Sequence, residues 1–391
     1  MWPIVVGISF LLFAEVSFSL WFFYWFIKFQ YIFAYALGYA PTTLPLHIGA
    51  TAAAGAKAFT SFQQIGAFLT YAGFVVWLGR EHFGHIAARA FGRISATPAE
   101  KTEALSYPVA FWGFFVSFAL LVSWCIAAGM RPDVALLLWG GYLVIALVLS
   151  RVVAEGGLLF VQQGWPPVGA IAQLLGAGPG TAFSASSIVP AQFVHVAMMT
   201  DVRAFLLPSF VQSFKLAHDR QIAARPLLAL IAAVTLVSFA IGVWMNVRLG
   251  YQSGGLGLNK WFAQSGAQIP ARDAAAMIGG ARDGGAINWF WLVVGALFTW
   301  SLIVARARLA WFPFHPIGYA MALTGPAHQM WFSMFLGWGA KTLITRFGGT
   351  DSARRATPFF LGLALGDVSM MLLWLVVDGA TGRVGHQIAV G

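Results

Sequence analysis

Charged residues are scarce in this chain, since they make up 9% of its 391 residues. Ordinary soluble domains carry roughly 25% charged residues. A water-soluble globule of this length could not cover its surface with so few polar side chains. Cysteine is nearly absent too, and the single Cys125 excludes a disulfide framework, a thiolate zinc site and an iron–sulfur cluster built by this chain alone. The sequence also lacks CxxCH, HExxH, GxGxxG and Walker motifs, so it predicts no bound cofactor or metal.

Apolar and aromatic residues are abundant instead. The hydrophobic fraction is 59%, with 35 Phe, 17 Trp and 43 Gly, and the mean hydropathy is +0.77. Packed transmembrane helices are typically rich in small residues at their contacts and in aromatic residues at the bilayer interfaces. The composition therefore predicts an all-α, polytopic integral membrane protein whose first partner is the lipid bilayer.

The apolar segments set the expected layout, because a membrane-crossing helix needs about 20 mainly apolar residues. We expect about nine or ten transmembrane helices and one or two discontinuous or re-entrant hairpins. The clearest expected spans are 3–27, 62–79, 108–128, 134–150, 226–247, 288–304, 313–323, 328–345 and 358–377.

Two further segments do not form clean spans by sequence. Segment 30–46 is short or re-entrant, and segment 155–200 is interrupted by glycine and proline, which indicates a discontinuous hairpin. Polar connectors at 80–104 and 250–286 separate the spans, the second with a short surface helix near 272–278. None of these gaps resembles a flexible linker, so residues 1–391 are expected to form one transmembrane domain.

The formal net charge of +10 is interpreted as a topology signal rather than as nucleic-acid binding. When the spans alternate, most Lys and Arg side chains fall on the same side as connector 80–104. We therefore expect a multi-pass protein of the cell's inner (plasma) membrane with that connector in the cytoplasm and no nucleic-acid partner.

Three ionisable residues stand out because each charge inside a span is costly unless it is paired or hydrated. Glu15 falls about halfway along the first expected span, where it could titrate with protons, hold a cation, or be satisfied by hydrogen bonds. Arg151 and Glu155 are four residues apart, hence on one helical face, and a Gly-Gly break follows. A charged pair at a helix break suits a transport site, and a structural salt bridge is the alternative.

The remaining candidates are two histidines and an aspartate. His195 and His315 are expected at membrane depth beside prolines, where an imidazole could relay protons or satisfy backbone groups that proline has freed. Asp367 falls about ten residues into the last span, after a GxxxG pair expected to pack closely on a neighbouring helix. This carboxylate needs a partner, for which Lys341 and Arg151 are the possible residues.

Five segments resemble an uncharacterised prokaryotic family of polytopic membrane proteins, which is distantly similar to the oligopeptide transporter superfamily. They are EVSFSLWFFYWFIK (15–28), RVVAEGG (151–157), WFPFHPIGYAMA (311–322), WFSMFLGWGAKTLITRFGG (331–349) and PFFLGLALGD (358–367). The resemblance covers nearly the whole chain and implies the fold of proton-coupled carriers of peptides or metal chelates. Members of that family look longer, with a further N-terminal helical half, so the resemblance also implies other membrane subunits or a homo-oligomer.

Two functions remain open at this stage. The leading hypothesis is a carrier, with proton-linked passage of a small polar or peptide-like solute; Glu15 and Glu155 would titrate, and Arg151 would hold an anionic group or tune Glu155. The alternative is a non-transporting structural or accessory subunit of a larger membrane complex. An enzyme is not expected, because the sequence displays no nucleophile–base or metal constellation.

Overall fold

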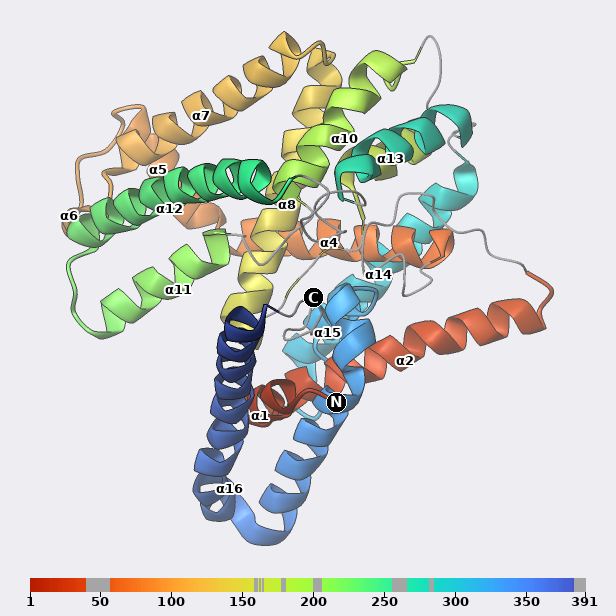
Figure 1. Cartoon of the computed structure of the whole chain (residues 1–391), viewed down its shortest axis with the longest axis vertical. Coiled ribbons are helices and arrows are strands. Elements are labelled where there is room, and N and C mark those ends of the chain that lie inside the picture. The colour runs from red at the N-terminus through yellow and green to blue at the C-terminus, as the bar shows by residue number, and fades with distance from the viewer. Residues whose placement is uncertain are drawn as a thin grey trace. The chain divides into compact units, whose positions relative to one another are not determined.

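The computed structural model describes residues 1–39, 57–157, 161, 163, 165–176, 181–199, 206–254, 266–280 and 285–382. Helices account for nearly all of this described part, which confirms the all-α class (Figure 1). Five described helices are long and apolar enough to cross a membrane: α7 (Tyr107–Ala127), α8 (Pro132–Gly156), α12 (Ala224–Ser253), α14 (Ala286–Arg308) and α16 (Gly325–Thr381). The chain is therefore a membrane protein with several apolar helices.

The chain divides into two compact units. The first contains Met1–Tyr71, Arg151–Trp165 and Ile287–Gly391, and the second contains Ala72–Ser150 and Pro166–Ala286. Helix α4 (Ala58–Leu78) and helix α8 each contribute residues to both units.

The first unit begins with a broken helix where a single span over 3–27 was expected. Helix α1 (Pro3–Leu11) ends before Leu12, and α2 (Ala14–Ala36) begins after Phe13. Leu12 and Phe13 interrupt the helix because their ψ angles are extended, at 161° and 136°. The prediction of one uninterrupted helix is therefore wrong. Glu15 lies in the first turn of α2 rather than midway along a span, and α2 continues into the segment expected to be re-entrant, whose residues 40–46 lie outside the described part.

Helix α16 is a helical hairpin whose two arms meet at Gly349, which adopts a positive φ of 72° (Figure 1). Its arms include both of the last two expected spans. Helix α1 packs tightly against α16 because glycines remove side chains at the crossings. A Cβ on Gly7 would lie 2.4 Å from the Phe360 carbonyl oxygen, and one on Gly337 would lie 2.6 Å from the Val6 carbonyl oxygen.

An aromatic core joins α2, α4, α14 and α15 (Pro316–Met321) within the first unit. Phe23, Phe298 and Tyr319 form neighbouring edge-to-face contacts, with ring centroids 4.7–6.2 Å apart. Polar side chains of α4 are buried here and find partners: Tyr319 Oη donates to Gln63 Oε1 at 2.8 Å, and Gln64 Nε2 donates to the Ala320 carbonyl at 2.8 Å. These buried amides give α4 a polar face that an isolated span could not satisfy in lipid.

Helix α15 also corrects an expectation. Segment 313–323 was expected to span the membrane, but only six residues are helical and all six are buried inside the first unit. The helix starts after His315 because Pro316 supplies a preset φ at its first position and His315 caps it.

The second unit contains the remaining elements. They are α5 (Arg80–Ala90), α6 (Pro98–Thr102), α7, most of α8, α9 (Pro167–Leu175), α10 (Ala185–Met199), α11 (Leu206–Asp219), α12 and α13 (Gly266–Gly280). The interruption expected within segment 155–200 is seen in its described residues, since α9 stops before Gly176, which has a φ of 89°, and a separate helix, α10, follows. The helix expected on the surface near 272–278 is instead packed against α10, and Met277 is buried.

Candidate functional site

Two helix breaks of the first unit come together. Helix α8 ends at Gly156, and Gly157 adopts a left-handed conformation with a φ of 61°. A Cβ placed on Gly157 would lie 3.0 Å from Cδ2 of Leu12, the residue at the break between α1 and α2. Helix termini expose backbone groups that have lost their helical partners, so this region can bind ions or polar groups.

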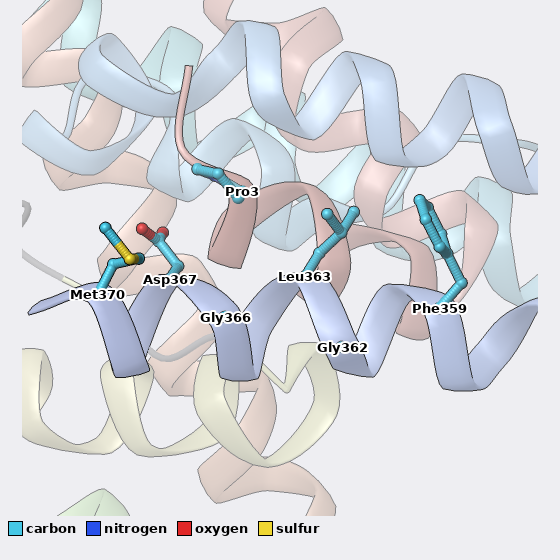
Figure 2. A pocket seen from close by; sticks show the side chains of 7 residues that line it. All are labelled: Pro3, Phe359, Gly362, Leu363, Gly366, Asp367 and Met370. Atoms are coloured by element: carbon cyan, nitrogen blue, oxygen red, sulfur yellow. The ribbon is translucent and has the colours of Figure 1, made fainter.

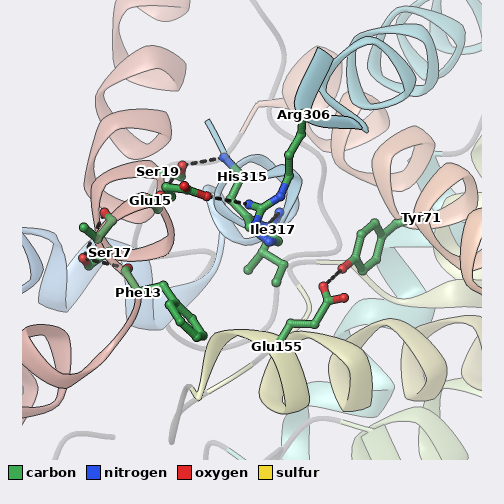
Figure 3. Close-up of polar contacts among 10 residues, drawn as sticks. Phe13, Glu15, Ser17, Ser19, Tyr71, Glu155, Arg306, His315 and Ile317 are labelled. Carbon is green, nitrogen blue, oxygen red and sulfur yellow. Dashed lines mark hydrogen bonds and ion pairs between the residues drawn. The ribbon is translucent and has the colours of Figure 1, made fainter. Parts of the chain in front are cut away.

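The first charged group at these breaks is a three-residue cluster on α8 and α4. The Arg151 guanidinium forms an ion pair with Glu155 Oε1, as the spacing predicted. Tyr71 Oη donates a hydrogen bond to the other oxygen, Glu155 Oε2 (Figure 3). The tyrosine is buried, whereas the Arg151 and Glu155 side chains remain 39% and 28% exposed. The carboxylate is thus held on both oxygens and remains partly exposed.

The second charged group joins the start of α2 to the end of α14. Glu15 Oε2 lies 3.2 Å from Arg306 Nη1 (Figure 3). Each charge also suits its position, because a carboxylate is favoured in the first turn of a helix and a guanidinium in the last turn. Both side chains are roughly half exposed, so the pair contributes at most about 1 kcal/mol to stability. Because the Glu15–Arg306 ion pair contributes so little to stability, separating the two side chains costs little free energy.

His315 connects the two groups electrostatically. Its backbone N–H donates to Ser19 Oγ at 2.7 Å, and Ser19 Oγ donates to the Glu15 carbonyl at 2.7 Å. Its Nδ1 accepts the Ile317 N–H at 3.2 Å and so caps α15 (Figure 3). The Arg306 and Arg151 guanidiniums both act electrostatically on this imidazole. His315 therefore satisfies backbone groups, as one of the two interpretations held, and leaves Nε2 to carry a proton in the neutral ring.

Asp367 has a different partner from those expected. Its Oδ2 accepts the N–H of Ile4 at 3.0 Å, so it caps the N-terminus of α1, and neither Lys341 nor Arg151 pairs with it. Lys341 instead donates from Nζ to the Leu12 carbonyl. A main-chain contact of this kind carries no sequence signature, which is why side-chain pairing was the natural expectation.

A shallow groove of about 450 Å³ lies beside Asp367 (Figure 2). The groove is lined by Pro3, Phe359, Gly362, Leu363, Gly366, Asp367 and Met370. The close packing expected of the GxxxG pair is not seen among the described residues, since a Cβ placed on Gly362 or Gly366 would have no neighbour within 4 Å among them. The glycines that permit close packing are others, Gly7 and Gly337 among them.

His195 belongs to the second unit, on α10. His195 is buried, with 3% of its surface exposed. Gln192, one turn earlier, is buried as well, and its Nε2 donates to Met277 Sδ of α13 at 2.9 Å. Asp273 of α13 is buried too, and this burial raises its pKa to about 6, with the Arg272 charge partly opposing the shift. The structure thus places His195 in a different unit from Glu15, Arg151, Glu155, His315 and Asp367.

Residues 1–390 match the model of the Family of unknown function (DUF6785). The chain belongs to this family. The comparisons with curated proteins and with solved structures returned no match.

In this DUF6785 member, the sequence did not indicate the roles of Tyr71 and Arg306 in the charged groups or the role of Lys341 at the helix break. Tyr71 and Arg306 are separated from their acidic partners by long stretches of chain, and Lys341 was considered only as a partner for Asp367. Arg306 had a usable signal, because an arginine in the last turn of an apolar helix often binds a carboxylate or lipid. Over the described ranges, no three His, Cys, Asp or Glu side chains gather closely enough to hold a metal ion.

Proposed function

We propose that this protein is a carrier of the plasma membrane that passes a small polar or peptide-like solute in a proton-linked step. The observation that carries the proposal is the cluster of Arg151, Glu155 and Tyr71 at the broken end of α8. Charged residues in apolar helices are costly and are retained mostly where they line pathways for ions or solutes. Carriers commonly bind their cargo at interrupted helices.

Glu155 is the proposed coupling carboxylate. In its ionised form it pairs with Arg151 and accepts from Tyr71. Protonation removes the negative charge, weakens the ion pair and frees the guanidinium for an anionic group of the solute. Binding of one proton therefore promotes binding of one solute, and proton-linked transport requires this coupling.

Glu15 and Arg306 form the second switch in this proposal. Their ion pair is half exposed and lies at the start of α2, on the far side of the Leu12–Phe13 break from α1. Because the pair is weak, opening it requires little energy. His315, bonded through Ser19 to the same turn of α2, relays the change between the two charged groups.

The test compares two isosteric substitutions, Glu155→Gln and Glu81→Gln. Glu81 lies in an exposed ion pair with Arg80 and is 89% exposed, so it controls for the loss of one carboxylate. Purified protein in liposomes is loaded with a pH-sensitive dye, and acidification of the lumen is followed after addition of dialanine or of free amino acids. We expect solute-dependent proton entry in the wild type and in Glu81→Gln, and none in Glu155→Gln. Unchanged proton entry in Glu155→Gln would exclude Glu155 from coupling and leave Glu15 as the candidate.

One observation favours the second function, a non-transporting subunit of a larger membrane complex. Helix α12 runs for 30 residues, and none of them is buried. A helix with all faces apolar and unburied is either surrounded by lipid or covered by another chain. Purification in mild detergent, followed by mass analysis of co-purifying chains, distinguishes these cases. A stoichiometric partner chain would support the function as a subunit of a larger complex.

A further inference from the structure

Helix α1 is held at both ends by charged side chains of α16. Asp367 Oδ2 accepts the Ile4 N–H at the start of α1, and Lys341 Nζ donates to the Leu12 carbonyl just past its end. A helix carries partial positive charge at its N-terminus and partial negative charge at its C-terminus. Each side chain therefore opposes the charge of the terminus that it meets.

The position of Lys341 follows from the close crossing one turn earlier. At Gly337 the first arm of α16 approaches α1 so closely that a Cβ would lie 2.6 Å from both the Val6 carbonyl oxygen and Ser9 Cβ. Residues four apart on a helix share one face, so Lys341 extends from that same face. The sequence GWGAK thus combines a contact glycine with a lysine that reaches the break.

The Leu12 carbonyl is available because the helix breaks there. The N–H groups of Val16 and Ser17 both donate to the Phe13 carbonyl, so α2 begins at Ala14, two residues after Leu12. Lys341 is half-buried, and within the described part of the chain it forms no ion pair with a carboxylate. The Lys341 Nζ group is therefore held by a neutral carbonyl at the negative end of a half-helix.

This arrangement matches the way in which broken-helix carriers hold a coupling metal ion. In such carriers, unwound carbonyls and the C-terminal ends of half-helices coordinate sodium. We propose that the Lys341 ammonium occupies a monovalent-cation site at the α1–α2 break, so that the protein needs no bound sodium. The comparison with sodium-binding carriers rests on the proposed carrier function. The occupancy of the cation site by Lys341 can be tested without any solute.

The experiment measures sodium-specific stabilisation of the purified full-length protein. Thermal unfolding in detergent is recorded in sodium chloride and in choline chloride at equal ionic strength, for the wild type, Lys341→Ala and Lys341→Ser. We expect no difference between the salts for the wild type, and a higher Tm in sodium for both variants. Sodium at ten times its dissociation constant should raise the Tm of a chain of this size by about 2 °C.

Two control variants separate the site from a general charge effect. Lys341→Arg keeps the positive charge, and Lys28→Ala removes a lysine of α2 that lies over the Tyr24 and Tyr31 rings. Neither should gain a response to sodium. A higher Tm of the wild type in sodium chloride than in choline chloride would overturn the inference. Equal Tm values in the two salts for both Lys341→Ala and Lys341→Ser would overturn it too. The wild-type measurement remains informative even if the variants unfold. None of these measurements depends on solute uptake, so a negative result for the cation site is distinct from a negative result for the proposed function.

Discussion

Adding one methyl group at Gly337 should destabilise the protein, whereas the same change two residues later should not. A Cβ at Gly337 would lie 2.6 Å from the Val6 carbonyl oxygen, 2.6 Å from Ser9 Cβ and 3.1 Å from the Phe10 nitrogen. Two of these atoms are backbone, so α1 and α16 must move apart. Overpacking of this kind typically costs about 1–3 kcal/mol.

Gly339 is the matched control. It lies on the same arm of α16, and a Cβ there would have no neighbour within 4 Å in the part of the chain that the structure describes. Replacing glycine by alanine inside a helix favours folding by roughly 0.8–1 kcal/mol through helix propensity alone. The same propensity gain applies at Gly337, so the net cost of Gly337→Ala is about 0–2 kcal/mol, and the two variants should differ by about 1–3 kcal/mol.

The assay is thermal unfolding of the purified variants in one detergent, followed by loss of the monodisperse peak on size exclusion. Gly339→Ala should have a Tm equal to or above that of the wild type, and Gly337→Ala a lower one. Equal shifts in the two variants would show that α1 does not cross α16 at this residue. The close approach that positions Lys341 over Leu12 would then lose its basis.

Two further predictions concern charges. Burial raises the folded-state pKa of Asp273 from 3.8 to about 6, so the wild type loses stability as the pH rises between these values. Asp273→Asn should therefore be more stable than the wild type at pH about 7.5, but not at pH about 4. The pKa shift corresponds to a gain in unfolding free energy of about 3 kcal/mol for a fully buried carboxyl group, and partial solvation reduces the expected gain to about 1–2 kcal/mol. Identical pH profiles of unfolding for Asp273→Asn and the wild type would refute this prediction. If the Arg151–Glu155 pair has a structural role only, the double variant Arg151→Met/Glu155→Leu should fold with near wild-type stability and retain solute-dependent proton entry. If the pair couples proton to solute, the double variant should fold but show no solute-dependent proton entry. Arg151→Met alone should be less stable than the double variant, by up to about 3 kcal/mol, because it leaves Glu155 without its partner.

The break between α1 and α2 illustrates what local sequence could not predict. Residues around Leu12 and Phe13 include neither glycine nor proline, so a continuous span was the reasonable expectation. The break is stabilised by distant groups, namely Lys341 at the freed carbonyl and Gly157 against the Leu12 side chain. Backbone groups freed in an apolar region must find partners, and here those partners come from the other end of the chain.

The short helix α15 gives the same lesson. Its apolar segment was expected to be a span, yet it is buried inside the first unit and capped by His315. Apolar residues are compatible both with lipid and with a protein interior, so hydropathy could not separate these outcomes. Gly318 decides in favour of burial, since a Cβ there would overlap Ser19 of α2.

The sequence by itself determined the class of the protein, because 9% charged residues can cover only a surface that faces lipid. It also determined the pairing of Arg151 with Glu155, since residues four apart share a helical face whatever the fold. Tertiary structure alone decided the partners of Glu15, Asp367 and Lys341. Those contacts join residues some 290 to 360 positions apart, and their energies depend on distances that only the packed helices fix.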